Sequence, residues 1–224
     1  SRQLMKSMRE SEASDFFGFD PGGKGRFGVA WLRGHEIRVE TVGSVKAAVK
    51  WAEDVCEGRP LAAGIDTLLH WSVGDGGNRE AERYLRKYLR SGVLSPNSLL
   101  GAMTIGGVTL ALKLRDRWPS IELNETHPKA LYSWFTGCAY RHNPQGAIAW
   151  LKARYVIDTV SLNDHEFDAL LSALATREAL RDDWCDLAKT HDDHVYMVCS
   201  VKYLWPCTTP MAVCKHEGRR TRQA

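Results

Sequence analysis

Two apolar runs flank an acidic, glycine-rich loop in residues 16–32, which read FFGFDPGGKGRFGVAWL. Short apolar runs bounded by Gly and Pro are typical of β-strands, and a polar loop between two of them is typical of a hairpin. We therefore predict strands at Phe16–Phe19 and Phe27–Leu32, with Asp20 where the first strand ends and the chain turns back. Because glycine carries no side chain, this loop would let a large charged ligand approach Asp20 closely.

The rest of the chain continues as an alternation of strands and helices. A third strand is predicted at Ile37–Val42 and a fourth at 61–66, where LAAGID ends in Asp66. Apolar residues at three- and four-residue spacing predict a helix over 44–57 between them. The later segments divide into helices (79–90, 99–117, 145–155, 163–180 and one that begins at Pro128), strand candidates (120–128 and 195–205) and a loop over 67–78.

This order of elements predicts the fold class. A three-strand meander, a helix and a fourth strand, followed by alternating helices and strands, indicate an α/β domain with a mixed sheet of five or more strands flanked by helices. We expect residues 15–206 to form this domain, with a helical insertion over about 78–118 after the fourth strand. The segments 1–14 and 207–224 are expected to be tails, the second of them flexible.

The composition is that of a globular protein in water. Of 224 residues, 44% are hydrophobic and 25% charged, and the most apolar segment, Leu99–Leu112, is shorter than the roughly 20 residues that span a bilayer. We see no signal peptide and therefore expect a cytoplasmic protein with no membrane partner. The six cysteines form no C-x-x-C pair and no zinc-like spacing, which predicts unpaired thiols in a reducing compartment.

Two aspartates occupy positions where a rigid element would hold them. Asp20 and Asp66 each end an apolar strand, a position that suits a functional site. Aspartate is also common in turns, where its side chain accepts hydrogen bonds from nearby backbone amides. Either explanation accounts for each residue taken singly.

The helix NDHEFDALLSALATREAL, over 163–180, carries more information. Asn163 and Glu166 fit a capping box, and Asp164 suits the first turn, where the helix dipole favours an acid. Asp168 lies past the first turn beside the core-facing stripe of the helix, so it costs stability unless it has a partner. A divalent cation is one such partner, and an arginine or a backbone donor is another.

A further strand candidate, in ELNETHP (122–128), carries a glutamate and a histidine two positions apart. On a strand, Glu125 and His127 point to one face and Thr126 to the other. His127 either packs before the next helix and bonds to Glu125, or carries protons beside a metal site. Glu125 is the better candidate ligand of the two.

Taken together, these acids form a candidate metal site: Asp20, Asp66, Glu125, Asp164 and Asp168. Hard cations such as Mg²⁺ and Mn²⁺ take oxygen ligands from several directions. Two such ions about 3.5–4 Å apart can activate a water and stabilise the leaving oxygen in phosphodiester hydrolysis. We therefore predict two Mg²⁺ or Mn²⁺ ions, with Asp20, Asp66, Glu125 and Asp168 as catalytic residues.

The formal charge of +3 arises from the segment after Pro206, so the rest of the chain is close to neutral. Any attraction of nucleic acid to this site therefore has to come from individual basic residues near it. Lys24 and Arg26, in the glycine-rich loop, are candidate phosphate contacts. The helix over 79–90 also carries a stripe of arginines: Arg79, Arg83, Arg86 and Arg90. This stripe could follow a phosphate backbone or could be the solvated face of an amphipathic helix.

Five segments in order carry a resemblance to a known family: GFDPGGKGRFGVAWL, AGIDTLLHWS, ELNETHP, DHEFDALLSALA and VKYLWP. They resemble an uncharacterised family of predicted nucleases with a ribonuclease H-like fold, placed near the RuvC resolvases and their YqgF relatives. The resemblance covers most of residues 16–206. It implies metal binding by Asp20, Asp66, Glu125, Asp164 and Asp168, and cleavage of DNA or RNA. RuvC-like enzymes carry a glutamate where this chain has Asp66.

Two other functions fit parts of the pattern. A catalytically inactive protein could keep the fold to bind nucleic acid or a partner protein, and the stretch IDTLLHWS, where the family usually has an IDAPLG-like one, favours this alternative. A phosphotransferase of the actin and sugar-kinase type also has an acidic, glycine-rich loop between two strands. Such proteins usually need a second, similar half, which this chain lacks, and DPGGKG does not match a phosphate-binding P-loop.

Overall fold

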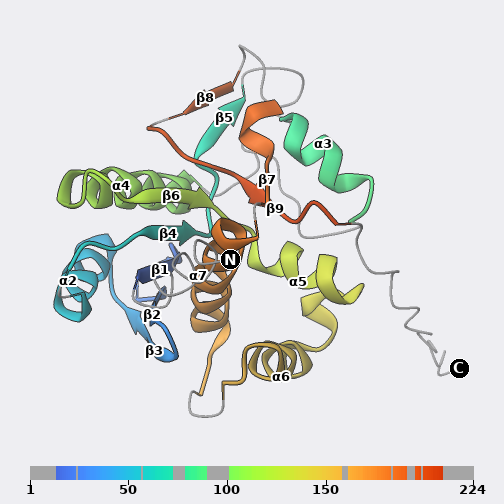
Figure 1. Ribbon diagram of the computed structural model, residues 1–224, viewed down its shortest axis with the longest axis horizontal. Coiled ribbons are helices and arrows are strands. Elements are labelled where there is room, and N and C mark those ends of the chain that lie inside the picture. The colour runs from blue at the N-terminus through green and yellow to red at the C-terminus, as the bar shows by residue number, and fades with distance from the viewer. Residues whose placement is uncertain are drawn as a thin grey trace, which may run out of the picture.

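A five-stranded mixed sheet forms the centre of the protein (Figure 1). The computed structural model describes residues 14–23, 25–56, 58–72, 79–89, 101–157, 161–182, 184–190, 195–197 and 199–208. In the order β3-β2-β1-β4-β6, the strands are Glu36–Val42, Phe27–Arg33, Asp15–Asp20, Ala62–Ile65 and Glu122–Glu125. The β1–β2 and β2–β3 pairs are antiparallel, and the β1–β4 and β4–β6 pairs are parallel. This ribonuclease H-like arrangement confirms the predicted fold class.

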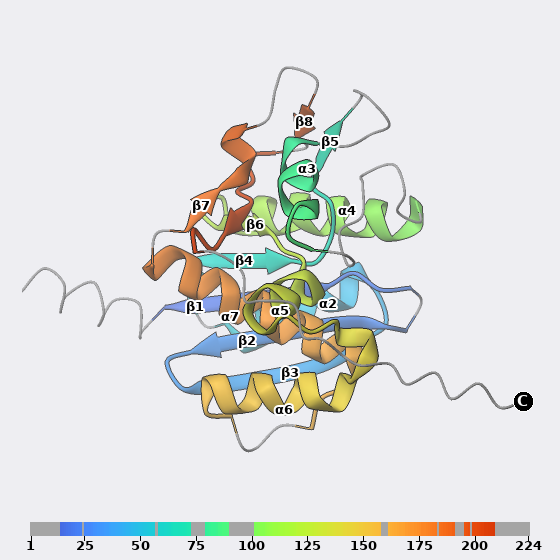
Figure 2. The ribbon, with the colours of Figure 1, turned by 90° about the vertical axis from the view of Figure 1, so that its right-hand side faces the viewer.

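Helices cover both faces of the sheet. In chain order they are α2 (Val45–Val55), α3 (Glu80–Arg86), α4 (Gly101–Arg117), α5 (Pro128–Thr136), α6 (Pro144–Tyr155) and α7 (Asp164–Arg181). Figures 1 and 2 show α2 and α4 on one side of the sheet and α5, α6 and α7 on the other. The helices α3 and α4 lie in the predicted insertion between β4 and β6.

The alternation of side chains along β1 separates these two faces. Phe17 and Phe19 pack with residues of α2 and α4 in one hydrophobic cluster. Phe16 packs in a second cluster with residues of α5, α6 and α7. Gly18 and Asp20, at two-residue steps from Phe16, therefore face α7. The strand thus delivers its terminal aspartate to the side of the sheet that α7 covers.

Helix α7 lies very close to the sheet because two strands present a glycine beneath it. Gly18 and Gly64 are partners in the parallel β1–β4 pair. A Cβ atom at Gly18 would lie 1.9 Å from the carbonyl oxygen of Ala169, and one at Gly64 would lie 2.4 Å from that of Ser172. Any side chain at these positions would push the helix away from the sheet. The glycine pair therefore sets how closely the acids of α7 approach those of β1 and β4.

The predicted closing strand over 195–205 is wrong as a single strand. Val195–Met197 forms β8, which pairs with β5 (His70–Ser72), and Leu204–Trp205 forms β9, which pairs with β7 (Cys185–Asp186). These are two small sheets beside the central one. The strand β5 also corrects the prediction that 67–78 is a loop throughout; residues 73–78 lie outside the described part of the chain.

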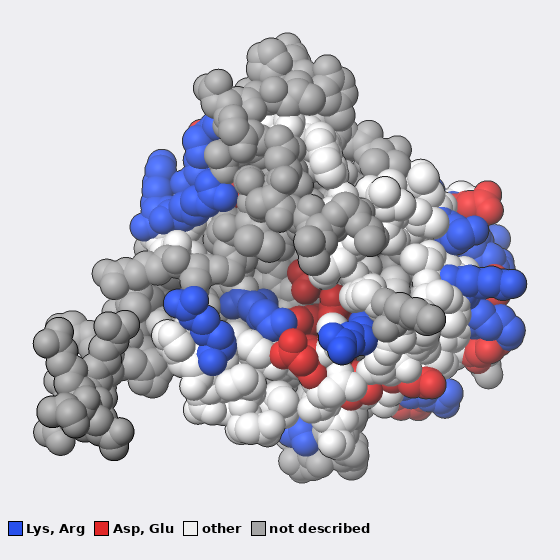
Figure 3. Space-filling model, turned by 180° about the vertical axis from the view of Figure 1, so that it is seen from behind, with Lys and Arg blue, Asp and Glu red and all other residues white. Residues whose placement is uncertain are grey.

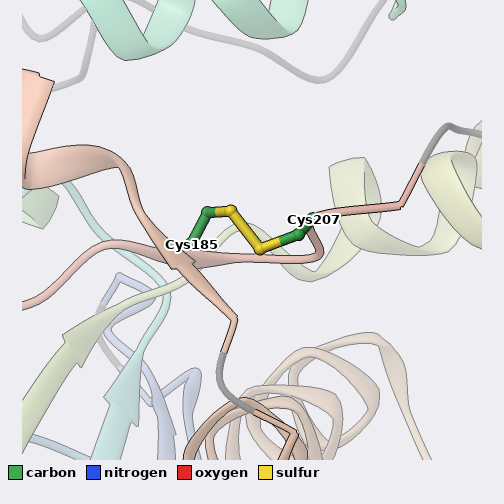
Figure 4. Close-up of a disulfide and its surroundings, with 2 residues drawn as sticks. All are labelled: Cys185 and Cys207. Atoms are coloured by element: carbon green, nitrogen blue, oxygen red, sulfur yellow. A yellow bond between two sulfur atoms is a disulfide. The ribbon is translucent and has the colours of Figure 1, made fainter.

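The C-terminal segment packs between α3 and α5 and is tied down by a disulfide. Tyr203 and Trp205 join a third hydrophobic cluster with Leu85 of α3 and Trp134 of α5. Cys185 and Cys207 form a disulfide across this segment, with a Cα–Cα distance of 5.4 Å (Figure 4).

The expectation of unpaired thiols is therefore wrong for several cysteines. Cys138 is disulfide-bonded as well as Cys185 and Cys207, whereas Cys56 and Cys199 are free. The absence of a C-x-x-C pair says nothing about cysteines that the fold brings together from distant positions. The basis on which a reducing compartment was predicted is thereby removed.

Two further predictions concern the tails of the chain and its relation to a membrane. Residues 1–13 and 209–224, which include most of the two predicted tails, lie outside the described residues. Within the described residues, no helix has the length and apolar character needed to cross a membrane.

Candidate active site

All four predicted aspartates gather where the carboxyl ends of β1 and β4 meet the first turns of α7. Asp20 is the last residue of β1, and Asp66 follows β4, with its backbone amide donating to the carbonyl oxygen of Phe19 over 2.8 Å. Asp164 and Asp168 lie one turn apart at the start of α7. The charges of Asp20, Asp164 and Asp168 all act on Asp66, so the four lie within electrostatic reach of one another. We call Asp20, Asp66, Asp164 and Asp168 the carboxylate cluster.

The predicted capping box fixes the start of α7. The side chain of Asn163 accepts a hydrogen bond from the Glu166 amide over 3.0 Å, and the Glu166 carboxylate accepts one from the Asn163 amide over 2.9 Å. Glu166 also accepts a hydrogen bond from Thr41 of β3 over 3.1 Å. The first turn of α7 is thus fastened to the edge of the sheet, which orients Asp164 and Asp168.

Asp168 is the most constrained member of the carboxylate cluster. It is 2% exposed, and its Oδ2 lies 2.6 Å from Nζ of Lys129. Its Oδ1 is buried and has no hydrogen-bond partner among the described residues. Burial raises the pKa of Asp168 to about 7, because it disfavours the charged form and the charge of Asp20 adds repulsion, although Lys129 opposes both. Asp168 therefore carries an oxygen that is short of a positive partner.

Lys129 is a member of the site that the sequence analysis missed. It lies in the first turn of α5, directly after Pro128, and its Nζ also lies 3.1 Å from Oδ2 of Asp164. The ammonium group lies 4.9 Å from the centre of the Tyr140 ring. Burial opposes the charged form of Asp164, but a hydrogen bond from Tyr140 and the charge of Lys129 hold its pKa below the ordinary value. Helix α5 therefore supplies a cation to two of the four acids.

His165 is a second missed member, on the first turn of α7. Its Nδ1 lies 2.5 Å from Oδ2 of Asp20, which is 5% exposed. The hydrogen bond to Asp20 raises the pKa of His165 above its ordinary value, although partial burial opposes this shift. The sequence contains a signal for this contact, because His165 lies three residues before Asp168 and so on the same side of the helix.

Asp66 is the member of the carboxylate cluster that lies nearest to His127. Burial raises the pKa of Asp66 well above its ordinary value, and the charges of Asp168 and Asp20 add to this effect. Nδ1 of His127 lies 4.0 Å from Oδ1 of Asp66, and Nε2 of the same ring lies 3.1 Å from Oε1 of Glu125. The predicted hydrogen bond between His127 and Glu125 is thus present, and His127 joins Glu125 to the edge of the carboxylate cluster.

The structure does not bring Glu125 itself into the carboxylate cluster. Glu125 is fully buried, and its carboxylate accepts hydrogen bonds from the guanidinium of Arg79, from the Leu69 and His70 amides, and bonds to the His70 ring over 2.8 Å. Burial disfavours its charge, but the charge of Arg79 and the hydrogen bonds of His127 and His70 hold the pKa of Glu125 well below the ordinary value. Its oxygens are occupied by protein groups.

The alternation along β6 explains this placement. Leu123 packs in the cluster on the α2 and α4 side, and Glu125 lies two residues further along the same side. Asn124 and Thr126 point to the other face, where they bond to Thr176 and Ser172 of α7. The sequence predicts that Glu125 and Thr126 point to opposite faces, and this is confirmed. It does not indicate which face holds the aspartates.

The predicted basic contacts fall into three environments. Arg26 is exposed in the β1–β2 loop beside Asp20, whereas Lys24 lies outside the described residues. Arg79 is neither a phosphate contact nor part of a solvated helix face, because it is fully buried against Glu125 and Glu82. Arg83 and Arg86 are exposed on α3, and Arg90 is not described. Figure 3 shows acidic side chains near the middle of one face of the molecule, with Lys and Arg side chains on both sides of them.

The described side chains do not form a complete metal site as they lie. Among them, no group of three or more His, Cys, Asp or Glu residues is placed so that it could hold a metal ion. Comparison with known proteins adds no further guide, since no family model, no curated protein and no solved structure matches this chain. The function therefore has to be argued from the site itself.

The carboxylate cluster predicts an unusual dependence of stability on pH. Asp66 and Asp168 have pKa values raised above those of the unfolded chain, so their contribution to stability is fully present below about pH 4 and is lost as the pH rises. For Asp168 this loss continues up to its pKa of about 7. Replacing Asp168 with asparagine removes part of this penalty. We expect Asp168→Asn to raise the free energy of unfolding by roughly 1–3 kcal/mol at pH 8 and by much less at pH 5.

Urea denaturation of both proteins between pH 5 and pH 8 measures this difference. Asp116→Asn is a matched control, because Asp116 is an exposed aspartate on α4. Its effect on stability should be small and should not change with pH. If Asp168→Asn instead lowers the free energy of unfolding by the same amount at pH 5 and pH 8, Asp168 is ionised throughout and well paired.

Proposed function

We propose that this protein is a metal-dependent nuclease that hydrolyses phosphodiester bonds of DNA or RNA at the carboxylate cluster. One observation carries the proposal: Asp168 is buried among three other aspartates, with one oxygen paired to Lys129 and the other, Oδ1, without a partner. An unpaired carboxylate oxygen in such a place costs stability. Binding a cation would remove that cost.

The chemistry of the cluster fits Mg²⁺ or Mn²⁺. These ions prefer carboxylate oxygens, and Asp20, Asp66 and Asp168 offer such oxygens from two strand ends and one helix. Because no three ligands are assembled in the described side chains, binding requires side-chain rotation at the site. When bound, such ions activate water and stabilise the charge that develops on phosphate oxygens.

The remaining residues of the site suit a polyanionic substrate. The glycine-rich loop beside Asp20 leaves open space, since a Cβ atom at Gly23 or Gly25 would meet no atom within 4 Å. Arg26 is exposed in that loop and could contact a phosphate. His165 orients the Asp20 carboxylate, and His127, held by Glu125, lies beside Asp66, where it could hold or move a proton.

The resemblance to the family of predicted nucleases placed near RuvC and YqgF supports the same proposal, because the motifs that carry it include Asp20, Asp66, Asp164 and Asp168 in that order. Glu125 is the exception. Since Arg79 and His70 occupy its oxygens, we assign it to holding His127 in place rather than to binding a metal. A role in positioning a histidine is common for buried carboxylates.

Calorimetric titration of Mn²⁺ tests the proposal. We expect the parent protein and Asp116→Asn to bind Mn²⁺, and the double variant Asp20→Asn, Asp168→Asn to lose binding while keeping its circular dichroism spectrum. Parent protein loaded with Mn²⁺ should cleave at least one of four labelled oligonucleotides: single-stranded DNA, duplex DNA, branched DNA or RNA. Cleavage should fall at least 100-fold in the double variant, as is usual when a catalytic group is removed.

A second candidate is a catalytically inactive binding module. The pairing of Lys129 with Asp164 and Asp168 favours it, because this lysine neutralises part of the cluster without any metal. A folded parent protein that binds oligonucleotide but takes up no Mn²⁺, either alone or with the oligonucleotide present, would support the binding module and contradict the nuclease.

A further inference from the structure

A single ammonium group bridges two members of the carboxylate cluster. Nζ of Lys129 lies 2.6 Å from Oδ2 of Asp168 and 3.1 Å from Oδ2 of Asp164. The two aspartates belong to consecutive turns of α7, so their oxygens face the same space. Bridging of two carboxylates by one positive centre is the contact that a bound divalent ion would otherwise make.

Lys129 is held in this position by more than the two ion pairs. Its backbone lies in the first turn of α5, which begins at Pro128 and packs on α7. The Tyr140 ring lies 4.9 Å from the ammonium group, and the side chain is 39% exposed. To leave the cluster, Lys129 would have to give up contacts with Asp164, Asp168 and the Tyr140 ring together.

Lys129 contacts Oδ2 of Asp168 and leaves the other carboxylate oxygen, Oδ1, without a positive partner among the described residues. Oδ1 of Asp168 has no hydrogen-bond partner, and the charges of Asp20 and Asp66 act on the same carboxylate. Asp20 bonds to His165, which leaves room in its carboxylate for one further ligand. Oδ1 of Asp168 is therefore the carboxylate oxygen left for a further positive partner, and Asp20 and Asp66 are the acids whose charges act near it.

We infer that the ammonium group of Lys129 takes the place of one of two metal ions, so that the carboxylate cluster binds a single divalent cation. This inference rests on the proposed function and replaces the two-ion site that the sequence predicts. Lys129 is then a positioning residue, because it holds Asp164 and Asp168 as a second ion would. Asp20, Asp66 and Oδ1 of Asp168 are the groups that would hold the single Mg²⁺ or Mn²⁺ ion.

Metal stoichiometry tests the inference without relying on activity. Mn²⁺ is titrated by calorimetry into the parent protein, Lys129→Met, Lys129→Arg and Lys113→Met, where Lys113 is an exposed lysine on α4. Electron paramagnetic resonance then shows whether bound Mn²⁺ ions are isolated or spin-coupled. We expect one isolated ion per chain in the parent protein, Lys129→Arg and Lys113→Met. Loss of the positive charge in Lys129→Met should admit a second ion and give a spin-coupled pair.

The outcomes separate this inference from the proposed function. A spin-coupled pair in the parent protein would overturn the inference and leave the nuclease proposal standing. One isolated ion in both the parent protein and a folded Lys129→Met variant would overturn it as well. No binding to the parent protein, with or without an oligonucleotide, would instead overturn the nuclease proposal. If Lys129→Met does not fold, Lys129→Gln replaces it, and the parent spectrum still decides against the inference if it shows a pair.

Discussion

Arg79→Met is expected to lower the free energy of unfolding by roughly 3–5 kcal/mol. Arg79 and Glu125 are both fully buried, and the guanidinium bonds to both oxygens of Glu125 and to the carbonyl oxygen of His70. It also bonds to Glu82, which is 1% exposed. Methionine fills a similar volume without charge, so the substitution leaves two buried carboxylates without their cation.

The effect should grow as the pH rises. In the parent protein, the pKa of Glu125 lies well below its ordinary value, so its contribution to stability is present above about pH 4.5 and is lost in acid. Without Arg79, burial dominates and raises the pKa of Glu125, so ionisation then costs stability as the pH increases. The difference between the two proteins, measured by urea denaturation, should therefore be larger at pH 8 than at pH 5.

Arg83→Met provides the matched control on the same helix. Arg83 and its partner Glu80 are 46% and 55% exposed, and such a pair contributes under about 1 kcal/mol. A double variant, Arg79→Met with Glu125→Gln, should recover part of the lost stability, because it removes one of the unpaired charges. Equal effects of Arg79→Met and Arg83→Met would contradict the buried pairing and, with it, the role assigned to Glu125.

The elements that the sequence predicts best are those with a local physical signature. The hairpin of β1 and β2, the capping box at Asn163 and the helix that begins at Pro128 all appear within a residue or two of the predicted bounds. Each depends on neighbouring residues alone: alternation, a cap or a fixed φ angle. The positions of Asp20 and Asp168 follow from these elements.

What the sequence does not predict depends on partners far along the chain. The strand β5 has three residues, and its partner β8 lies more than 120 positions later, so no local pattern marks β5 or its pairing with β8. Cys185 and Cys207 meet because β7 and β9 pair, which their spacing does not reveal.

In the candidate site, too, some residues are placed by local patterns and others only by partners far along the chain. Asp20 and Asp66 can be placed from strand ends, but the face that α7 covers is known only once the sheet is assembled. Glu125 therefore appeared equivalent to the aspartates, although it points to the opposite face and meets Arg79. Lys129 was missed for a related reason, since a lysine in the first turn of a helix is ordinarily solvated. Its partners on α7 make it part of the site.

Gly18→Ala is the second substitution with a large expected effect, and it acts on fold and site together. A Cβ atom at Gly18 would lie 1.9 Å from the carbonyl oxygen of Ala169 and 2.6 Å from the amide nitrogen of Ala173. Both are backbone atoms of α7, so rotation of a side chain cannot relieve the overlap. We expect a loss of roughly 3–5 kcal/mol of unfolding free energy, and of Mn²⁺ affinity at any temperature where the variant is folded.

Two comparisons isolate the close approach of α7 as the cause. Gly43→Ala should change stability by less than about 1 kcal/mol, because a Cβ atom at Gly43 would meet no atom within 4 Å. Adding Ala173→Gly to Gly18→Ala should recover little, since that change removes only the contact with the Ala173 Cβ atom at 2.9 Å. Full recovery in that double variant would show that side-chain packing, and not the helix backbone, limits the distance between α7 and β1. In that case α7 could move relative to β1, and the glycine would no longer explain why Asp168 lies so close to Asp20.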